Sequence, residues 1–237
     1  MDSVNLSLPH FLFPPVHREG VPFVLAAGGV ALLFHSLFIW LGHPLVALLF
    51  WILPCCVYYF FRDPERVPPL DADAVVSPAD GTVCLITQAP LPEQLSLELC
   101  PVVWRVSVFM SMLNVHVNRV PADGTITKMH YVPGEIINAS LDKASEANER
   151  HLYLMTAANG QQIAFVQIAG LVARRIVSFV REGQTLARAE RFGLIRFGSR
   201  MDVYLPQGVE PSVRVGQTMV AGESVIARLK RAEGPGA

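Results

Sequence analysis

Residues 21–61 most limit how this chain can fold, because this stretch contains no Asp, Glu, Lys or Arg. It divides into two apolar segments, 21–41 and 43–61, on either side of a helix-ending turn at Gly42-His43-Pro44. Each segment has about the twenty residues that a helix needs to cross a bilayer. We therefore expect an N-terminal hydrophobic helical hairpin that spans or re-enters a membrane. The alternative is a core hairpin of a soluble protein.

The flanks of this hairpin predict where the protein lies. A cleaved signal peptide is a poor interpretation, because the apolar stretch begins late, is too long and is followed by no small-residue cleavage site. Arg18 precedes the hairpin, and Arg62 and Arg66 follow it, whereas its turn carries no Lys or Arg. The positive-inside rule then places both ends of the hairpin in the cytoplasm. We expect a protein of the cell membrane whose C-terminal domain lies on the cytoplasmic side.

Residues 67–237 show a different pattern, with short runs of Val, Ile, Phe and Tyr between Gly, Pro, Asn and Asp. This pattern predicts a mainly β domain that closes as a barrel or a sandwich. The segments SPADGTVCLI (77–86) and VPADGTITKM (120–129) repeat a turn followed by a strand. With VRVGQTMVAGESVIARL (213–229) they look like the hairpins of biotinyl/lipoyl-type barrels. We therefore divide the chain into a membrane-anchoring hairpin, 1–66, and a β-rich domain, 67–237.

Composition and motifs exclude several kinds of function. The formal net charge of −1 leaves no basic excess to neutralise phosphates, so we expect no nucleic-acid partner. The chain has no nucleotide-binding glycine loop, no G-x-S-x-G around Ser199 and no zinc-ligand spacing, so we expect no metal. Its four cysteines include no C-x-x-C pair, which is typical of free thiols in a reducing compartment.

The segment GLIRFGSRMDVYLP (193–206) places Gly198-Ser199 between two predicted strands. A turn is the ordinary interpretation. A second interpretation is that the Ser199 hydroxyl attacks the carbonyl of Gly198, because glycine is easily strained into the required geometry. The resulting ester can break by β-elimination and leave a dehydroalanine, which water hydrolyses to a pyruvoyl group with release of ammonia. The ketone of this group forms a Schiff base with an amine and acts as an electron sink. The dipeptide by itself leaves both interpretations open.

Several segments together resemble the short bacterial form of phosphatidylserine decarboxylase. In chain order they are FFRDPERVP (60–68), SPADGTV (77–83), FMSMLNVHVNRVPADG (109–124), VPGEIINASLDKASEANERH (132–151), QIAGLVARRI (167–176) and ERFGLIRFGSRMDVYLP (190–206). The resemblance covers essentially the whole chain, and the N-E-R and R-F-G-S-R blocks are its specific parts. It implies decarboxylation of phosphatidylserine to phosphatidylethanolamine, a step of phospholipid biosynthesis, at the bacterial inner membrane.

The resemblance also implies how the enzyme is made. A zymogen would cleave itself autocatalytically at Gly198–Ser199 into a β chain, 1–198, and an α chain, 199–237, which stay partners. Ser199 would become a covalent pyruvoyl cofactor that forms a Schiff base with the substrate. Asp80 matches the acidic residue proposed to drive self-cleavage, and His116 matches a histidine that acts on the substrate.

Further residues are candidates for substrate binding. The resemblance makes Asn148, Glu149 and Arg150 candidates for lining the site. Arg174 and Arg175 are a basic pair suited to a lipid phosphate or an anionic membrane surface.

One departure affects the expected mechanism. Longer members of the family carry a second histidine three residues after the first, and here that position is Arg119. Either His116 serves both steps, or Asp80 acts on Ser199 directly or through water. The sequence does not determine which base starts self-cleavage or which acyl chains are preferred. It also leaves open whether the protein forms a homo-oligomer and whether the hairpin spans or re-enters the membrane.

Two rival functions remain. One is a membrane-tethered biotinyl/lipoyl-like carrier or adaptor module with Lys143 as the carrier site and Gly198-Ser199 as a plain turn. The other is a phosphatidylserine-binding protein with an inactive site. Self-cleavage separates the enzyme from the carrier, and release of carbon dioxide separates it from the inactive protein.

Overall fold

A computed structural model describes residues 13–95, 102–134, 148–170, 175–196 and 199–230. The chain divides into two compact units, residues 1–65 and 66–237.

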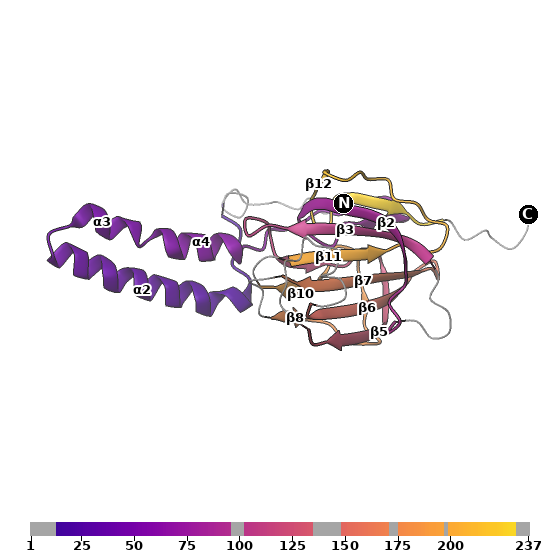
Figure 1. Cartoon of the computed structure of the whole chain (residues 1–237), viewed down its shortest axis with the longest axis horizontal. Helices are drawn as coiled ribbons and strands as arrows, with labels where there is room; N and C mark the ends of the chain where they lie inside the picture. The colour runs from indigo at the N-terminus through magenta and orange to yellow at the C-terminus, as the bar shows by residue number, and fades with distance from the viewer. Residues whose placement is uncertain (1–12, 96–101, 135–147, 171–174, 197–198, 231–237) are drawn as a thin grey trace, which may run out of the picture. The chain divides into compact units, whose positions relative to one another are not determined.

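The first unit is a helical hairpin built from the two apolar segments. It contains the short 3-10 helix η1 (Arg18–Gly20) and the helices α2 (Val21–Trp40), α3 (Pro44–Leu49) and α4 (Ile52–Phe60). The helix α2 packs beside α3 and α4 (Figure 1). Its large apolar side chains, Leu25, Leu33 and Trp40 among them, remain exposed. With a mean hydropathy of 2.0, the helical stretch 18–40 is long and apolar enough to cross a membrane.

The second apolar segment differs from the expected single helix. It forms α3 and α4, which are separated at Phe50 and Trp51. Pro54 explains the break, because its nitrogen carries no hydrogen to donate to the carbonyl of Phe50, four residues earlier. Stacking of Phe34 on Phe50, with ring centroids 4.8 Å apart, holds α2 against the interrupted segment.

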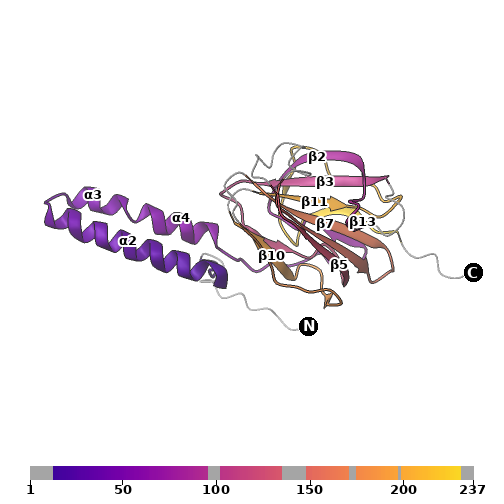
Figure 2. The ribbon, with the colours of Figure 1, turned by 60° about the horizontal axis from the view of Figure 1, so that its bottom comes forward.

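The second unit is mainly β, as the sequence predicts. Its strands are β1 (Ala74–Val76), β2 (Gly81–Pro90), β3 (Val102–Met110), β4 (Val117–Arg119), β5 (Gly124–Val132), β6 (Arg150–Ala157), β7 (Gln162–Ala169), β8 (Ile176–Ser178), β9 (Thr185–Leu186), β10 (Arg191–Ile195), β11 (Ser199–Tyr204), β12 (Thr218–Met219) and β13 (Val225–Arg228). An antiparallel sheet of eight strands runs β12-β2-β3-β11-β7-β6-β5-β9 and curls on itself (Figures 1 and 2). Smaller sheets pair β4-β10-β8 and β1-β13.

Period-two alternation gives the large sheet two apolar faces. On β11, Met201 and Val203 point into the inner cluster with Val106 and Val108 of β3. Tyr204 belongs to a second cluster on the outer face. Full burial of a large apolar side chain contributes about 1.5–3 kcal/mol, so the inner cluster is the main source of stability.

The two Pro-Ala-Asp-Gly turns repeat in three dimensions. The strands β2 and β5 each begin at the glycine of the motif, Gly81 and Gly124. A Cβ on Gly81 would lie 2.1 Å from the carbonyl oxygen of Phe109, and one on Gly124 would lie 2.3 Å from that of Thr156. Each turn therefore brings its strand against a neighbouring backbone where only glycine fits. The biotinyl/lipoyl-like character of these hairpins stays a prediction.

Candidate active site

Ser199 is the first residue of β11, and its side chain is fully buried. It pairs with Met110 at the end of β3 and with Ala169 at the end of β7. Its Oγ lies 3.8 Å from Sδ of Met110, to which it donates a weak hydrogen bond. Ser199 therefore lies in the interior at one end of the sheet, rather than on an exposed turn.

The N-E-R segment reaches this end of the sheet. Asn148 is fully buried, and its Nδ2 donates to the carbonyl oxygen of Ala169 at 2.7 Å. Ala169 is the residue opposite Ser199, and its own N–H donates to the carbonyl of Glu149 at 3.0 Å. Arg150 begins β6 and pairs with Ile168. The structure thus brings all three predicted residues close to the β7 end that faces Ser199.

Asp80 lies at the same end but on the other side of β3. It directly precedes β2, whose Thr82 pairs with Phe109. Because β2 and β11 both flank β3, Asp80 and Ser199 are about two strand spacings, roughly 10 Å, apart. The carboxylate accepts from Arg66 at 3.0 and 2.8 Å and from the N–H of Ala221 at 2.7 Å. These contacts hold the carboxylate of Asp80 in a fixed position.

His116 is fully buried just before β4. Its Nδ1 lies 2.9 Å from the carbonyl oxygen of Asn114. A carbonyl oxygen only accepts, so Nδ1 carries the proton and Nε2 is the basic nitrogen of the neutral ring. The backbone carbonyl of His116 accepts from Ile195 of β10, at the end of the strand that precedes Ser199 in the chain.

Of the basic pair Arg174 and Arg175, only Arg175 lies within the described residues. Arg175 is exposed, and its carbonyl accepts from the N–H of Arg196 at 3.2 Å, three residues before Ser199. Tyr131 is another neighbour of this region, since its phenol interacts with Glu149 and Arg175, and desolvation raises its pKa. Arg174 and Gly198 lie outside the described residues, as does Lys143 of the rival carrier hypothesis.

Arg119, which stands where longer family members carry a second histidine, and Arg200, which follows Ser199, both have structural contacts. The guanidinium of Arg119 donates to the carbonyl of Ala189 at 2.9 Å, and its side chain is almost fully buried. Arg200 points to the outer face and forms a buried ion pair with Asp202, with N–O distances of 2.6 and 2.7 Å. Neither side chain replaces a second histidine as a base.

Sequence reasoning missed four side chains at this end of the domain: Arg66, Met110, Asn118 and Gln167. All four lie in segments that carry the family resemblance. Arg66 is noticed in the sequence only as a charge that flanks the hairpin, and no charge or spacing pattern singles out Met110 or Asn118. Gln167 had a recognisable signal, because it is the one polar residue between Phe165 and Ala169 on a buried strand. Their roles depend on contacts between strands that are distant in sequence.

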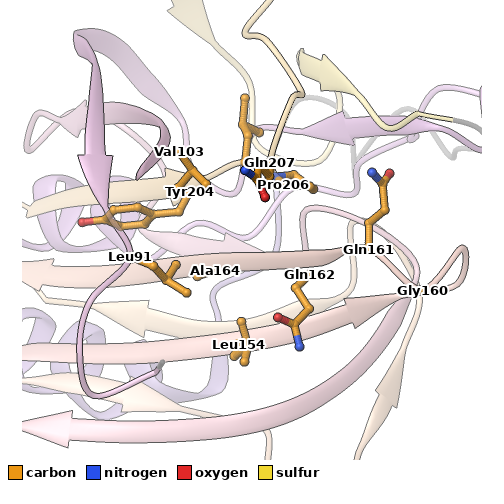
Figure 3. A pocket seen from close by; sticks show the side chains of 11 residues that line it. Leu91, Val103, Leu154, Gly160, Gln161, Gln162, Ala164, Tyr204, Pro206 and Gln207 are labelled. Atoms are coloured by element: carbon orange, nitrogen blue, oxygen red, sulfur yellow. The ribbon is translucent and has the colours of Figure 1, made fainter. Parts of the chain in front are cut away.

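Other features of the β unit lie away from Ser199. The cavity in Figure 3 has a volume of about 410 Å³ and is lined by residues such as Val103, Leu154 and Tyr204. These side chains belong to the outer cluster, and Tyr204 is at the opposite end of β11 from Ser199. Within the described ranges, no group of three or more His, Cys, Asp or Glu side chains is placed to hold a metal ion.

Comparison with known proteins gives one consistent result. A family model described as phosphatidylserine decarboxylase matches residues 53–227. A protein from Cereibacter sphaeroides is 53% identical over 219 residues, which cover 92% of each chain. A protein from Gluconacetobacter diazotrophicus is 53% identical over 217 residues, which cover 90% of this chain and 94% of the relative. Both relatives are named phosphatidylserine decarboxylase proenzyme.

Proposed function

The chain belongs to the phosphatidylserine decarboxylase family, and we propose that it is made as a proenzyme which cleaves itself at Gly198–Ser199 and then converts phosphatidylserine to phosphatidylethanolamine. The burial of Ser199 at the start of a central strand carries this proposal. A serine in an exposed turn has no need of a fixed, water-poor setting, whereas a nucleophile benefits from one.

Self-cleavage requires the Ser199 oxygen to attack the preceding carbonyl. Oγ forms a bond to the carbonyl carbon of Gly198, and the C–N bond of the peptide breaks, which leaves the two pieces joined by an ester. β-Elimination of the ester then cuts the chain, with a carboxylate on Gly198 and a dehydroalanine at position 199, and water hydrolyses the dehydroalanine to the pyruvoyl group with release of ammonia. The hydroxyl proton passes to a base, and the released nitrogen takes up a proton. His116 is the base we propose, because the hydrogen bond to Asn114 leaves Nε2 as its basic nitrogen. The same nitrogen, once protonated, can return a proton to the substrate.

Asp80 has a different role in this proposal. Its carboxylate is already bound by Arg66 and by the N–H of Ala221. Direct abstraction of the Ser199 proton would have to act across β3. We therefore propose that Asp80 acts electrostatically, by holding the end of the sheet in place and stabilising positive charge that develops on His116.

The residues around Ser199 suit a pyruvoyl group. Such a group supplies a ketone that accepts electrons when an amine-bearing substrate loses carbon dioxide. Conversion of serine replaces the hydroxymethyl by a methyl group, which packs well against the soft, apolar thioether of Met110. Asn148, Glu149 and Arg150 would position the headgroup, and Arg174 and Arg175 would attract its phosphate.

The helical hairpin provides a reason for a membrane location. We propose that it holds the β unit at the cytoplasmic face of the bacterial inner membrane, where the lipid substrate is concentrated. In a cysteine-free chain, His43→Cys should react with an impermeant reagent from the periplasmic side and Glu210→Cys only from the cytoplasmic side. Labelling of both cysteines from the same side would contradict a spanning hairpin.

Intact-protein mass spectrometry tests the chemistry. The wild-type chain should give fragments 1–198 and 199–237, with the second lighter by the mass of ammonia than its sequence. Ser199→Ala should remain one uncleaved and inactive chain. His116→Ala should lose decarboxylation, measured as carbon dioxide released from phosphatidylserine vesicles. A cleaved Ser199→Ala chain would refute the pyruvoyl proposal, and normal turnover by His116→Ala would refute the role of His116.

A further inference from the structure

A line of polar side chains crosses the otherwise apolar inner face of the sheet. We call these side chains the polar row: His151, Tyr153, Gln167 and Asn118. The hydroxyl of Tyr153 lies 3.0 Å from Nδ1 of His151 and donates to Oε1 of Gln167 at 2.8 Å. Nε2 of Gln167 then donates to Oδ1 of Asn118 at 2.8 Å. The row joins strands β6, β7 and β4, which are distant in sequence.

The polar row ends at the thioether beside Ser199. Nδ2 of Asn118 donates to Sδ of Met110 at 3.6 Å, and Oγ of Ser199 donates to the same sulfur at 3.8 Å. A thioether sulfur only accepts hydrogen bonds. In the uncut chain the Ser199 hydrogen therefore points toward Met110, which fixes the position of Oγ, and the hydrogen turns from the sulfur to the base when Oγ attacks.

Every hydrogen bond in the row has a determined direction. Because Oε1 of Gln167 only accepts, the Tyr153 hydroxyl is its donor, so Nδ1 of His151 is the donor to Tyr153. Burial raises the pKa of Tyr153 well above its ordinary value, which keeps the phenol protonated. Burial lowers the pKa of His151 to about 4, which keeps its ring neutral at pH 7. Donors therefore run in one direction, from His151 toward Met110.

Three of the four side chains of the polar row are enclosed, and His151 at its far end is half-buried. Tyr153, Gln167 and Asn118 are fully buried, and the Tyr153 ring stacks on Phe165 with centroids 5.1 Å apart. A Cβ on Gly193 of β10 would lie 2.7 Å from Nε2 of Gln167, so only glycine leaves room for this amide. Buried hydrogen bonds of this kind add little net stability compared with apolar side chains of the same shape. The presence of polar side chains at these buried positions is therefore better explained by a contribution to the geometry at Ser199 than by a contribution to stability.

We propose that Tyr153, Gln167 and Asn118 are positioning residues that hold the thioether of Met110 against Ser199 and so orient the hydroxyl for self-cleavage. This inference rests on the proposed self-cleavage at Gly198–Ser199. The row removes no proton and touches no substrate. It acts through Met110, and the proton of Ser199 leaves to the base.

An apolar version of the row separates geometry from stability. The single variant Asn118→Leu leaves Nε2 of Gln167 without its acceptor and should lower the midpoint of urea unfolding. The triple variant Tyr153→Phe/Gln167→Met/Asn118→Leu replaces the three buried polar side chains by apolar ones of similar volume. Its urea midpoint should therefore recover much of the loss caused by Asn118→Leu alone. Self-cleavage of the triple variant should nevertheless be slower than wild type by roughly tenfold or more.

The experiment uses the full-length chain, synthesised in the presence of detergent micelles, and follows the appearance of fragment 199–237 with time. Tyr204→Phe is the matched control, because it removes a buried phenol from the outer face of the same sheet, and it should cleave at the wild-type rate. Cleavage of the triple variant within about twofold of wild type, at restored stability, would overturn the inference. If the triple variant does not fold, Tyr153→Phe alone decides, since cleavage at the wild-type rate would also overturn it.

The outcome also distinguishes this inference from the proposed function. A wild-type chain that never cleaves would remove the proposed function and this inference with it. If the wild-type chain cleaves and the triple variant cleaves equally fast, only the positioning role of the polar row is refuted, and the proposed function stands.

Discussion

Asp80 shows how one carboxylate is held by residues that are far apart in the chain. Arg66 precedes it by fourteen positions and Ala221 follows it by 141, yet both lie within hydrogen-bond distance. The ion pair is mostly shielded from water, with side-chain exposures of 14% and 13%. Charge-assisted hydrogen bonds in such a setting contribute more than surface ion pairs do.

Replacing Arg66 should therefore destabilise the β unit. We expect Arg66→Met to lower the free energy of unfolding by about 2 kcal/mol, because Asp80 loses its cationic donor. Urea unfolding followed by tryptophan fluorescence measures this loss. Arg228→Met is the matched control, since its partner Asp71 is at the surface and the pair is open to solvent. Equal losses of unfolding free energy in the two variants would show that the Arg66–Asp80 pair stabilises the chain no more than a surface ion pair does.

His151 should make stability depend on pH in a defined window. Its pKa is lowered from 6.5 to about 4 in the folded chain, chiefly by desolvation and also by the nearby charge of His130. Between these values the unfolded chain binds a proton that the folded chain does not, so stability falls as the pH drops from about 6.5 to 4. Above pH 6.5 this effect is absent.

The variant His151→Gln tests this dependence, because glutamine keeps a donor toward Tyr153 but does not titrate. We expect the urea midpoint of wild type to fall more between pH 7 and pH 5 than that of His151→Gln. Parallel pH profiles for the two chains would assign the acid sensitivity to other groups.

At the scale of elements, the strands that the sequence predicts are those with long apolar runs. β3 and β5 extend over nine residues each and show the alternation that favours a strand. β4, β9 and β12 have two or three residues, which is too short for any period to appear. Their pairing partners, and not their own side chains, make them strands.

The turn glycines offer a test at this scale. Gly124→Ala places a methyl group against the Thr156 carbonyl oxygen, so we expect a loss of about 3 kcal/mol in unfolding free energy. Gly160→Ala is the control, because Gly160 has a φ of 84° but no atom within 4 Å of an added Cβ. There we expect only the backbone strain of about 1–2 kcal/mol. A smaller loss at Gly124 than at Gly160 would contradict the close approach of β5 and β6.

At the scale of the whole molecule, self-cleavage would cut the chain next to a central strand. β11 pairs along its length with β3 on one side and β7 on the other. The segment 199–237 also contributes β12 to β2 and β13 to β1. Its apolar residues Met201, Val203 and Ile226 lie in the inner cluster.

The two proposed chains should therefore stay together. We expect fragments 1–198 and 199–237 to elute as one species in size-exclusion chromatography in mild detergent, and to separate only after unfolding in denaturant. The unfolded Ser199→Ala chain provides the mass reference for an uncut protein. Elution of the small fragment by itself without denaturant would show that β11 does not hold the two pieces together.

The sequence alone determined the classes of structure and the chemistry to look for. Residues 21–61 lack charges and predict a helical hairpin, and the short apolar runs after residue 67 predict a mainly β unit, because burial patterns are local and periodic. The F-G-S-R and N-E-R motifs in the sequence indicated Ser199 as the reactive residue and Asn148, Glu149 and Arg150 as site residues.

Only the tertiary structure decided which side chains meet. β11 lies between β3 and β7, and this places Ser199 against Met110. β4 pairs with β10, and Asn118 of β4 contacts the same sulfur. Gln167 is an isolated polar residue in sequence, and its hydrogen bonds reach across forty-nine positions to Asn118. Such contacts depend on strand order and register, which arise from the balance of all long-range pairings and not from any local pattern.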